Sequence, residues 1–355
     1  MPVRSLLLIS NGHGEDAIGA EIARRLPPSI RVDAYSTLGD GGAYDGICTL
    51  VGPRAHLPSE GWRNVKGSLA KDFFGSGVAT VWPGLGFLRS ARQTYDRVAV
   101  VGDMIGIYGC WLTGHRDVIY IDVYKTGFGR RYLAIDRAIL LRTARKVFCR
   151  AETLADMLRD ARVDATAAGN VMMDTIPRQG LKLDRTRRFG LTLLPGSRGH
   201  AVENFVIQAN ALRMLPDVLR PDLFLAVAGS LDPAAFLRHA GGLKINLVPG
   251  AAMGDALDAS DIVMSQAGTA TVQAIGLGRP ALTFRTAEDR PSRIADESRL
   301  FGDAREVVDG TPTAVAVALE RLLRDPPEVA RRAAVGRQRI GPPGAIEAIL
   351  DSLVA

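Results

Sequence analysis

The sequence predicts an α/β protein of two domains, each built on a parallel sheet. Short apolar runs alternate with helical patterns along all 355 residues, which is typical of parallel sheets covered by helices on both faces. A polar, basic stretch at residues 180–188 interrupts this alternation near the middle of the chain. Because 355 residues exceed the usual size of one domain, we expect the domain boundary at this stretch.

The expected strands are the short apolar runs, which fall into two series. The first series covers residues 5–10, 31–35, 97–101, 118–122 and 146–149, and the second covers 191–194, 223–227, 244–248, 261–264 and 281–284. Apolar residues spaced three and four apart between the runs predict amphipathic helices. We therefore predict an N-terminal domain at 1–178 and a C-terminal domain at 179–334. A helix at about 335–355 is expected to pack back on the first domain after the Pro342-Pro343-Gly344 break.

Composition narrows the class of partner. The net charge of +6 favours an anionic partner, such as a phosphorylated substrate or an acidic membrane surface. Nucleic acid is disfavoured, because aromatics are only 6% and the arginines are spread along the chain. Cys48, Cys110 and Cys149 are far apart and odd in number, which predicts a reducing, cytoplasmic compartment. The first apolar run, at 6–9, is too short for a signal peptide.

The strongest local signal is the segment Leu-Leu-Pro-Gly-Ser-Arg at 193–198, where a strand ends and a helix follows. Amides at a helix start bind anions, and Arg198 can add a bidentate contact to phosphate. This pattern favours phosphate binding over an ordinary turn with a solvated arginine.

A second loop points the same way. Gly268-Thr-Ala-Thr271 follows a strand and opens another helix. Glycine lets the backbone approach a ligand closely, and the threonine hydroxyls lie beside helix-start amides. One such loop is often only a helix cap, but two in one domain indicate a pyrophosphate site.

The opening loop of the chain has a different character. Ser-Asn-Gly-His-Gly-Glu-Asp at 10–16 fits the loose glycine fingerprint of dinucleotide-binding proteins. However, Glu15 and Asp16 occupy the helix start and would repel a pyrophosphate. The loop suits a neutral hydroxyl, and His13 can act as its base. A simple turn-capping role for His13 is an equal alternative.

Asp103 ends a buried strand at the same expected edge. It can serve as the base or orient His13, although an aspartate after a strand is also a common helix cap.

An apolar segment at 73–88 lacks charge, and basic residues bracket it. Its glycines and Pro83 make it too short and too interrupted to span a bilayer. We predict partial insertion at an anionic membrane surface, with a buried segment as the alternative. The predicted membrane contacts are Phe73, Phe74, Trp82 and Phe87.

Several segments together resemble the lipid-A-disaccharide synthases, especially the synthase-related proteins of cyanobacteria and deinococci. The resemblance covers nearly the whole chain in the same order. Its motifs are residues 10–16, 101–103, 169–174, 193–198 with Glu203, 268–271 with 278–280, and 298–300 with Gly302.

The resemblance implies a GT-B fold, in which two Rossmann-like domains face each other across a cleft. It also implies inverting transfer from a UDP-sugar to a glycolipid without a metal or other cofactor. Asp103 matches the proposed catalytic aspartate of the family. The residues expected to bind the donor are Gly196, Ser197, Arg198, Ser230, Gly268, Thr269, Ala270, Thr271 and Gln273. The acceptor-side residues are Asn11, Gly12, Gly14, Glu15 and Asp16.

Two departures from the family pattern weaken the transfer of the family's residue roles to this sequence. Gln273 stands where the synthases have a glutamate expected to hold the ribose, and Val171 replaces a usual proline. The opening loop also differs from that of the synthases themselves, so the sugar and acceptor need not be those of lipid A.

The resulting prediction is a peripheral glycosyltransferase at the cytoplasmic face of the inner membrane. Its expected partners are a nucleotide sugar, a lipid or glycolipid acceptor and an anionic membrane surface; the oligomeric state is left open, a homodimer being one option. The alternatives are a nucleotide-sugar 2-epimerase, a non-catalytic nucleotide-sugar-binding protein and, last, a dinucleotide-dependent dehydrogenase.

Overall fold

The computed structural model describes residues 3–38, 40–54, 77–197, 200–229, 231–286, 289 and 291–355. The side chains of His13, residues 77–80 and Arg293 lie outside the described part. The chain divides into two compact units. Unit 1 comprises Met1–Thr175, Arg290–Asp296 and Pro343–Ala355, and unit 2 comprises Ile176–Asp289 and Glu297–Pro342.

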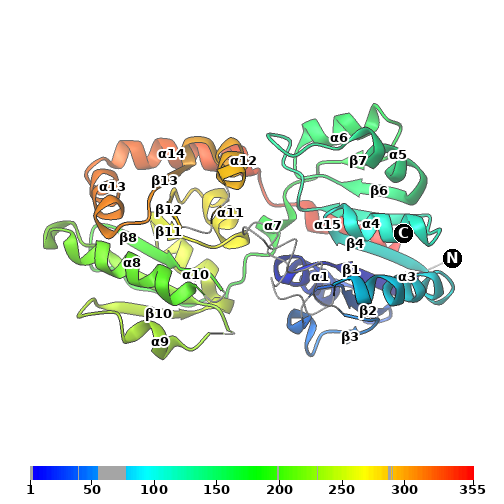
Figure 1. Ribbon diagram of the computed structural model, residues 1–355, viewed down its shortest axis with the longest axis horizontal. Helices are drawn as coiled ribbons and strands as arrows, with labels where there is room; N and C mark the ends of the chain where they lie inside the picture. Colours follow the sequence, from blue (N-terminus) through cyan, green and yellow to red (C-terminus); the bar gives the residue numbers. More distant parts are fainter. Residues whose placement is uncertain are drawn as a thin grey trace. The chain divides into compact units, whose positions relative to one another are not determined.

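Unit 1 contains a parallel sheet in the order β3-β2-β1-β4-β5-β6-β7 (Figure 1). Its strands are β1 Ser5–Ser10, β2 Arg31–Ser36, β3 Thr49–Leu50, β4 Arg97–Gly102, β5 Val118–Asp122, β6 Ala144–Phe148 and β7 Ala165–Thr166. Strands β4 and β5 are buried at every residue, because helices cover both faces of the sheet.

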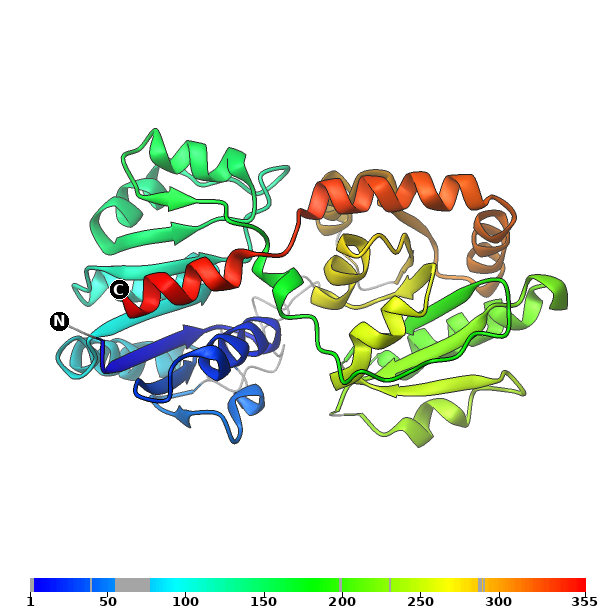
Figure 2. The same cartoon turned by 180° about the vertical axis from the view of Figure 1, so that it is seen from behind.

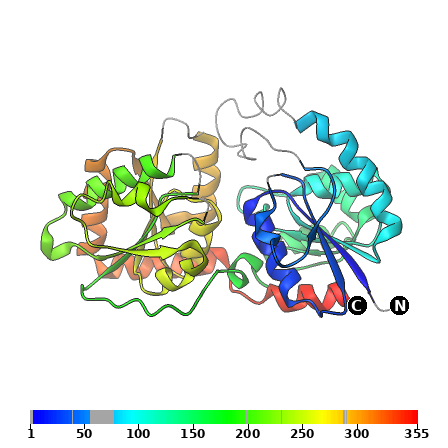
Figure 3. The same ribbon diagram turned by 90° about the horizontal axis from the view of Figure 1, so that it is seen from below.

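The helices of unit 1 lie on two faces of its sheet. They are α1 His13–Arg25, α3 Gly77–Thr94, α4 Met104–Leu112, α5 Ala134–Thr143, α6 Glu152–Arg159, α7 Val171–Asp174 and α15 Ala345–Val354. Helix α4 packs between α3 and α5, and α15 packs on α1, β5 and β6. Figures 2 and 3 show α15 and α3 on opposite faces of the sheet.

Unit 2 contains a second parallel sheet, in the order β10-β9-β8-β11-β12-β13. Its strands are β8 Gly190–Leu194, β9 Asp222–Val227, β10 Ile245–Pro249, β11 Ile262–Ser265, β12 Ala281–Arg285 and β13 Arg305–Asp309. Its helices are α8 Ala201–Met214, α9 Pro233–Leu237, α10 Met253–Asp258, α11 Thr269–Gly276, α13 Pro312–Arg324 and α14 Pro326–Ile340, and α12 Pro291–Phe301 crosses the unit boundary.

All ten predicted strands are confirmed to within two residues at each end. The sequence analysis missed three strands: β3 and β7 have only two residues each, and β13 is only partly buried. Such strands carry little of the apolar signal on which the prediction rests.

The motif at 169–174 ties the end of the chain to unit 1. The Asp174 carboxylate accepts hydrogen bonds from the amides of Gly344, Ala345 and Ile346, at 2.7, 2.9 and 3.1 Å. These amides begin α15 and have no partner within the helix. Gly169 has φ +141°, and a Cβ there would lie 3.0 Å from the Pro343 carbonyl oxygen. The motif therefore positions α15 on the sheet.

No helix in the described part of the chain is long and apolar enough to cross a membrane.

Candidate functional site

The first loop of interest in unit 1 joins the ends of two neighbouring strands. Strands β1 and β4 pair in register, with Ser10 opposite Val101. The residues that follow therefore meet at the carboxyl edge of the sheet, where ligands bind in open α/β folds. The Asn11 amide donates from Nδ2 to Asp103 Oδ1 at 2.7 Å. The sequence predicted both residues for the site without predicting that they touch.

Asp103 is half-buried and caps helix α4. Its Oδ1 atom accepts the backbone N–H of Ile105 at 2.8 Å, in addition to the bond from Asn11. The sequence predicted either a base or a helix cap at Asp103. The residue is a helix cap, and it also lies at the carboxyl edge of the sheet. The side chain of His13, the other candidate base, lies outside the described residues.

Glycine is required where these two loops meet. Gly102 has φ +137°, and a Cβ there would lie 2.2 Å from Asn11 Oδ1 and 3.3 Å from Glu15 Cγ. Gly12 has φ +155°, and its Cβ would lie 2.8 Å from Glu15 Oε2. Glycine is favoured at both positions because φ is positive and because there is no room for a Cβ atom. The two glycines let Asn11, Glu15 and the Asp103 backbone come close together.

Asp16 is buried and holds neighbouring hydroxyl groups by hydrogen bonds. It is 1% exposed, and its carboxylate accepts hydrogen bonds from Ser10 Oγ at 2.5 Å and Ser36 Oγ at 3.0 Å. Ser10 Oγ also lies 2.8 Å from the Tyr44 hydroxyl, and burial raises the pKa of Tyr44. This buried cluster ties α1 to the ends of β1 and β2. Of the two acidic residues, only the half-buried Glu15 retains some exposure to solvent.

A second buried carboxylate, that of Asp136 in the first turn of α5, was not predicted as part of a site. Asp136 is 1% exposed and accepts hydrogen bonds from Lys125 Nζ and the Leu133 amide, both at 3.0 Å, and from the Tyr108 hydroxyl. Against the raising effect of burial, these bonds hold the pKa of Asp136 below its ordinary value. The apolar pattern of the sequence gives no sign that Lys125 pairs with an aspartate eleven residues later.

Asp122, at the end of β5, is a buried carboxylate with three hydrogen-bond donors. The amides of Tyr124 and Lys125 each donate at 2.9 Å, and the Tyr132 hydroxyl donates as well. Burial raises the pKa of Asp122 to about 6, although these hydrogen bonds act in the opposite direction. The group therefore shapes the loop at 122–132 at a cost in desolvation.

Replacing Asp122 by asparagine is expected to make the slope of stability against pH more positive between about pH 4 and 6. The folded pKa of about 6 lies above the ordinary 3.8, so the folded state binds more protons than the unfolded state in this window. The contribution of Asp122 to stability therefore falls as pH rises through it. Urea unfolding at several pH values measures the slope. Asp232→Asn, at an exposed helix cap, is the control. An unchanged slope in the Asp122 variant contradicts a raised pKa for Asp122.

In unit 2, the loops after β8 and β11 lie side by side. Strands β8 and β11 pair in parallel, and the Gln266 amide donates to the Leu194 carbonyl at 2.8 Å. Gly196 has φ +112°, and Asn204 of α8 donates to the Pro195 carbonyl at 2.9 Å. The loop after β8 is thus held at both sides, and Ser197 is exposed. Arg198 and Ser230 lie outside the described residues.

Helix α11 begins at an open glycine. Gly268 is exposed, and a Cβ at this position would have no atom of the described part of the chain within 4 Å. Thr269 and Ala270 follow as half-buried residues in the first turn, where helix amides lack intrahelical acceptors. This start of α11 can accept an anion in contact with its backbone.

Thr271 and Gln273 have less access to a ligand. Thr271 is 3% exposed, and its hydroxyl lies 2.6 Å from Ser265 Oγ and donates to the Ala267 carbonyl at 2.5 Å. Gln273 is 4% exposed. In this structure the Thr271 hydroxyl stabilises the loop from inside. A donor contact for either residue stays a prediction.

The side chain of Gln266 is a support that the sequence did not reveal. Its Nε2 donates to the Phe284 carbonyl at 2.8 Å, and its Oε1 accepts the Phe284 amide at 3.1 Å. This pair fixes the loop after β11 against β12. The only sequence signal was a glutamine directly after a strand, which by itself does not indicate a contact eighteen residues away.

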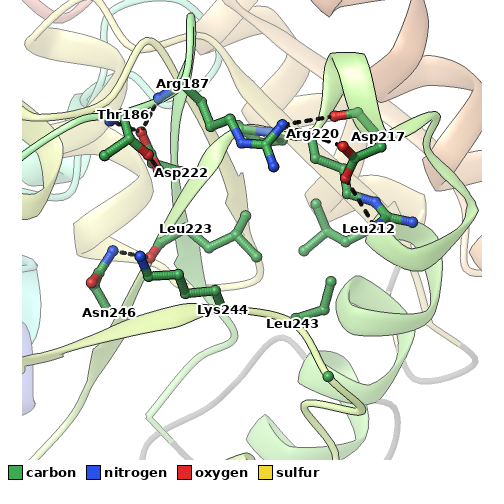
Figure 4. Close-up of a pocket in the computed structure, with 12 residues that line it drawn as sticks. Thr186, Arg187, Leu212, Asp217, Arg220, Asp222, Leu223, Leu243, Lys244 and Asn246 are labelled. Carbon is green, nitrogen blue, oxygen red and sulfur yellow. Dashed lines mark hydrogen bonds and ion pairs between the residues drawn. The ribbon is translucent and has the colours of Figure 1, made fainter.

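A cavity of about 300 Å³ lies at the opposite edge of the unit 2 sheet, near the amino ends of β9 and β10. Figure 4 shows Arg187 and Arg220 directed toward Asp217, with leucines below. Asp217 lies 3.6 Å from Arg187 Nη1 and 3.4 Å from Arg220 Nη1, and Asp222 accepts the Thr186 amide at 2.6 Å. None of the predicted site residues lines this cavity. Within the described residues, no three His, Cys, Asp or Glu side chains form a potential metal site.

No family model matches the sequence, and no curated protein matches it. Solved structures do match over almost the whole chain. The glycosyltransferase SnogD from Streptomyces nogalater is 17% identical, with a TM-score of 0.58 over 99% of this chain and 100% of its own. The fold is GT-B. This confirms the predicted fold class, with parallel sheets of seven and six strands.

Two further GT-B structures are not described as glycosyltransferases. A Listeria monocytogenes protein designated a UDP-N-acetylglucosamine 2-epimerase is 15% identical, with a TM-score of 0.62 over 99% of this chain and 96% of its own. S. aureus MnaA with UDP is 13% identical, with a TM-score of 0.60 over 98% and 95%. At these identities the likeness concerns the GT-B fold. The resemblance to lipid-A-disaccharide synthases stays a prediction.

Proposed function

We propose that this GT-B protein is a glycosyltransferase that moves a hexosyl or N-acetylhexosaminyl group from a UDP-sugar to a lipid or glycolipid acceptor at the cytoplasmic membrane face. The observation that carries the proposal is a division of chemistry between the units. Unit 2 offers an open helix start beside a second glycine loop, which suits a diphosphate. Unit 1 offers a fixed carboxylate at Asp103, which suits a base.

In the proposed reaction, the acceptor hydroxyl oxygen attacks the anomeric carbon of the donor sugar. The bond between that carbon and the diphosphate oxygen breaks, and UDP leaves with the electron pair. Asp103 takes the proton of the hydroxyl, with His13 as the alternative base. Arg198 and the amides at the start of α11 stabilise the charge on the departing diphosphate. The family resemblance adds inversion at the anomeric carbon and no requirement for a metal.

Three of the neighbours in structure support a nucleotide sugar as donor. One is a glycosyltransferase, one is designated a UDP-sugar epimerase, and one was solved with UDP. A panel of radiolabelled UDP-sugars incubated with the protein and a membrane lipid extract tests the proposal. We expect label in the organic phase with one or a few of the donors. Absence of labelled lipid with every donor contradicts lipid transfer.

The epimerase neighbours favour a second candidate, a nucleotide-sugar 2-epimerase. That reaction needs no acceptor. Product analysis after incubation with UDP-N-acetylglucosamine alone separates the two functions. A new UDP-sugar indicates epimerisation. A donor that stays unchanged alone and is consumed only after lipid is added indicates transfer.

Exposed apolar side chains on α3, α4, α5 and the loop before α5 support the membrane part of the proposal. Trp82 of α3 is 78% exposed, and Leu112 of α4 and Leu133 before α5 are each 64% exposed. Helix α4 packs against both α3 and α5. We call this set the α3–α5 surface; its members are Val81, Trp82, Ile105, Trp111, Leu112, Tyr124, Phe128, Leu133, Ile135 and Leu141.

Exposed arginines accompany the α3–α5 surface. Arg89 and Arg92 lie on α3, Arg131 lies before α5, and Arg142 lies within α5. Apolar side chains with basic neighbours suit an anionic bilayer surface. Phe87, one of the predicted contacts, instead packs on Tyr35 with ring centroids 4.9 Å apart and supports the core of unit 1. Phe73 and Phe74 lie outside the described residues.

Replacing Leu112 by glutamate is expected to weaken binding to vesicles of phosphatidylglycerol and phosphatidylcholine about tenfold. Burying a leucine contributes about 1.5–3 kcal/mol, and a carboxylate also repels an anionic surface. Val317→Glu on α13 is the matched control, because Val317 is also 64% exposed but belongs to unit 2. Co-sedimentation measures the bound fraction. Equal binding of the two variants contradicts a role for the α3–α5 surface.

A further inference from the structure

Asn11 lies in a position that is unusual for a purely structural residue. Its Nδ2 donates to Asp103 Oδ1 at 2.7 Å. Its own Oδ1 atom is buried and accepts no hydrogen bond from the part of the chain that the structure describes. A buried acceptor without a donor costs free energy. An aliphatic residue would avoid that cost, so the value of asparagine here lies in its N–H group.

The contact constrains Asp103 on one side only. Two donors of the described residues, Asn11 Nδ2 and the Ile105 amide, bond to this carboxylate, and both bond to Oδ1. Oδ2 accepts no hydrogen bond from any described residue. A carboxylate held through one oxygen presents the other in a defined direction, as a base requires.

The surroundings of this carboxylate limit what it can receive. Glu15 lies against the same glycine corner, with Cγ 3.3 Å from the position of a Cβ on Gly102. An anionic nucleophile at this point would be repelled by the Asp103 carboxylate. A neutral hydroxyl would not be repelled and could donate to Oδ2.

We propose that Asn11 is a positioning residue that fixes the Asp103 carboxylate plane, so that Oδ2 receives the proton of an uncharged alcohol. This inference rests on the proposed function in one respect, since the alcohol is the acceptor of the sugar. The placement of the carboxylate by Asn11 is a property of unit 1 alone and can be tested without any activity.

The first test is structural. Crystal structures of the wild-type protein and of Asn11→Ala give the orientation of the Asp103 carboxylate. We expect one orientation in the wild type, and rotation about χ2 or more than one conformer in the variant. An identical single orientation in the variant overturns the proposal. This outcome is independent of whether the protein transfers sugar.

The second test is kinetic and uses the transfer assay. Asn11→Ala is expected to lower kcat by about 10- to 100-fold, because a misplaced reacting group slows the chemical step. The KM for the donor should stay unchanged. In an Asp103→Ala background the same change should cause no further loss, since residues that act as a unit are not additive. A full additional loss in that background overturns the proposal.

Asn246→Ala is the matched control. Asn246 Nδ2 donates to the Leu223 carbonyl at 3.2 Å, so it too is an amide donor, but it lies in unit 2 away from the proposed site. We expect this variant to keep the kcat of the wild type. If the wild-type protein transfers sugar from no donor, the proposed function fails, while the crystal structures still decide whether Asn11 positions Asp103.

Discussion

Replacing Asp103 by alanine is expected to lower the kcat of sugar transfer about a thousandfold and to leave the affinity for UDP unchanged. A positioned general base typically contributes 10²- to 10⁴-fold to rate. Asp103 belongs to unit 1, whereas the proposed diphosphate contacts belong to unit 2, so catalysis and UDP binding should separate. Steady-state kinetics and calorimetry with UDP measure the two quantities.

The control must account for the role of Asp103 as a helix cap. Its Oδ1 accepts the Ile105 amide, and loss of a cap costs about 1 kcal/mol of stability. Asp325 caps α14 in the same way, through the Glu328 amide at 3.1 Å. Asp325→Ala should therefore show a similar loss of stability with unchanged kcat. If the two variants have the same kcat, Asp103 is only a cap.

Replacing Gly268 by valine is expected to weaken UDP binding about a hundredfold with little loss of stability. A Cβ at Gly268 meets no atom of the described residues within 4 Å, so the added side chain mainly obstructs a ligand that approaches the start of α11. Close backbone approach to a phosphate is a known reason for glycine at such a position. Calorimetry with UDP and a thermal melt measure the two effects.

Gly86→Val is the matched control, because Gly86 is likewise open to added atoms but lies on α3 of unit 1. It should bind UDP like the wild type. Arg198→Ala provides a companion test, with a loss of similar size expected from a missing charge-assisted contact to phosphate. UDP affinity that survives both the Gly268 and the Arg198 changes would exclude the diphosphate site from these two loops.

The pattern of apolar runs was enough to predict most of the sheet structure. Buried parallel strands such as β4, β5 and β8 read as continuous apolar segments, and a local pattern of this kind needs no knowledge of distant residues. The glycine loops after β8 and β11 were also evident, because a strand, a glycine and a helix start follow one another along the chain. Their pairing as neighbours follows from the order β8-β11 in the sheet.

The chemical environment of the site residues required the tertiary structure. The pairs Asn11–Asp103 and Asp174–Gly344 are separated by 92 and 170 positions. The sequence named Asn11, Asp103 and Asp174 as motif residues, but it predicted neither of these two contacts. The same holds for Thr271, whose hydroxyl looked available for a ligand and is buried against Ser265.

By itself, then, the sequence determined the fold class, the strand positions and the loops that carry the candidate site. The tertiary structure decided which side chains are held, by which partner, and which remain open to a ligand. The physical reason is that backbone periodicity and glycine conformation are local properties, whereas a hydrogen bond between two loops depends on which strands are neighbours in the sheet. Strand β1 lies beside β4 rather than β3, and that neighbour brings Asn11 to Asp103.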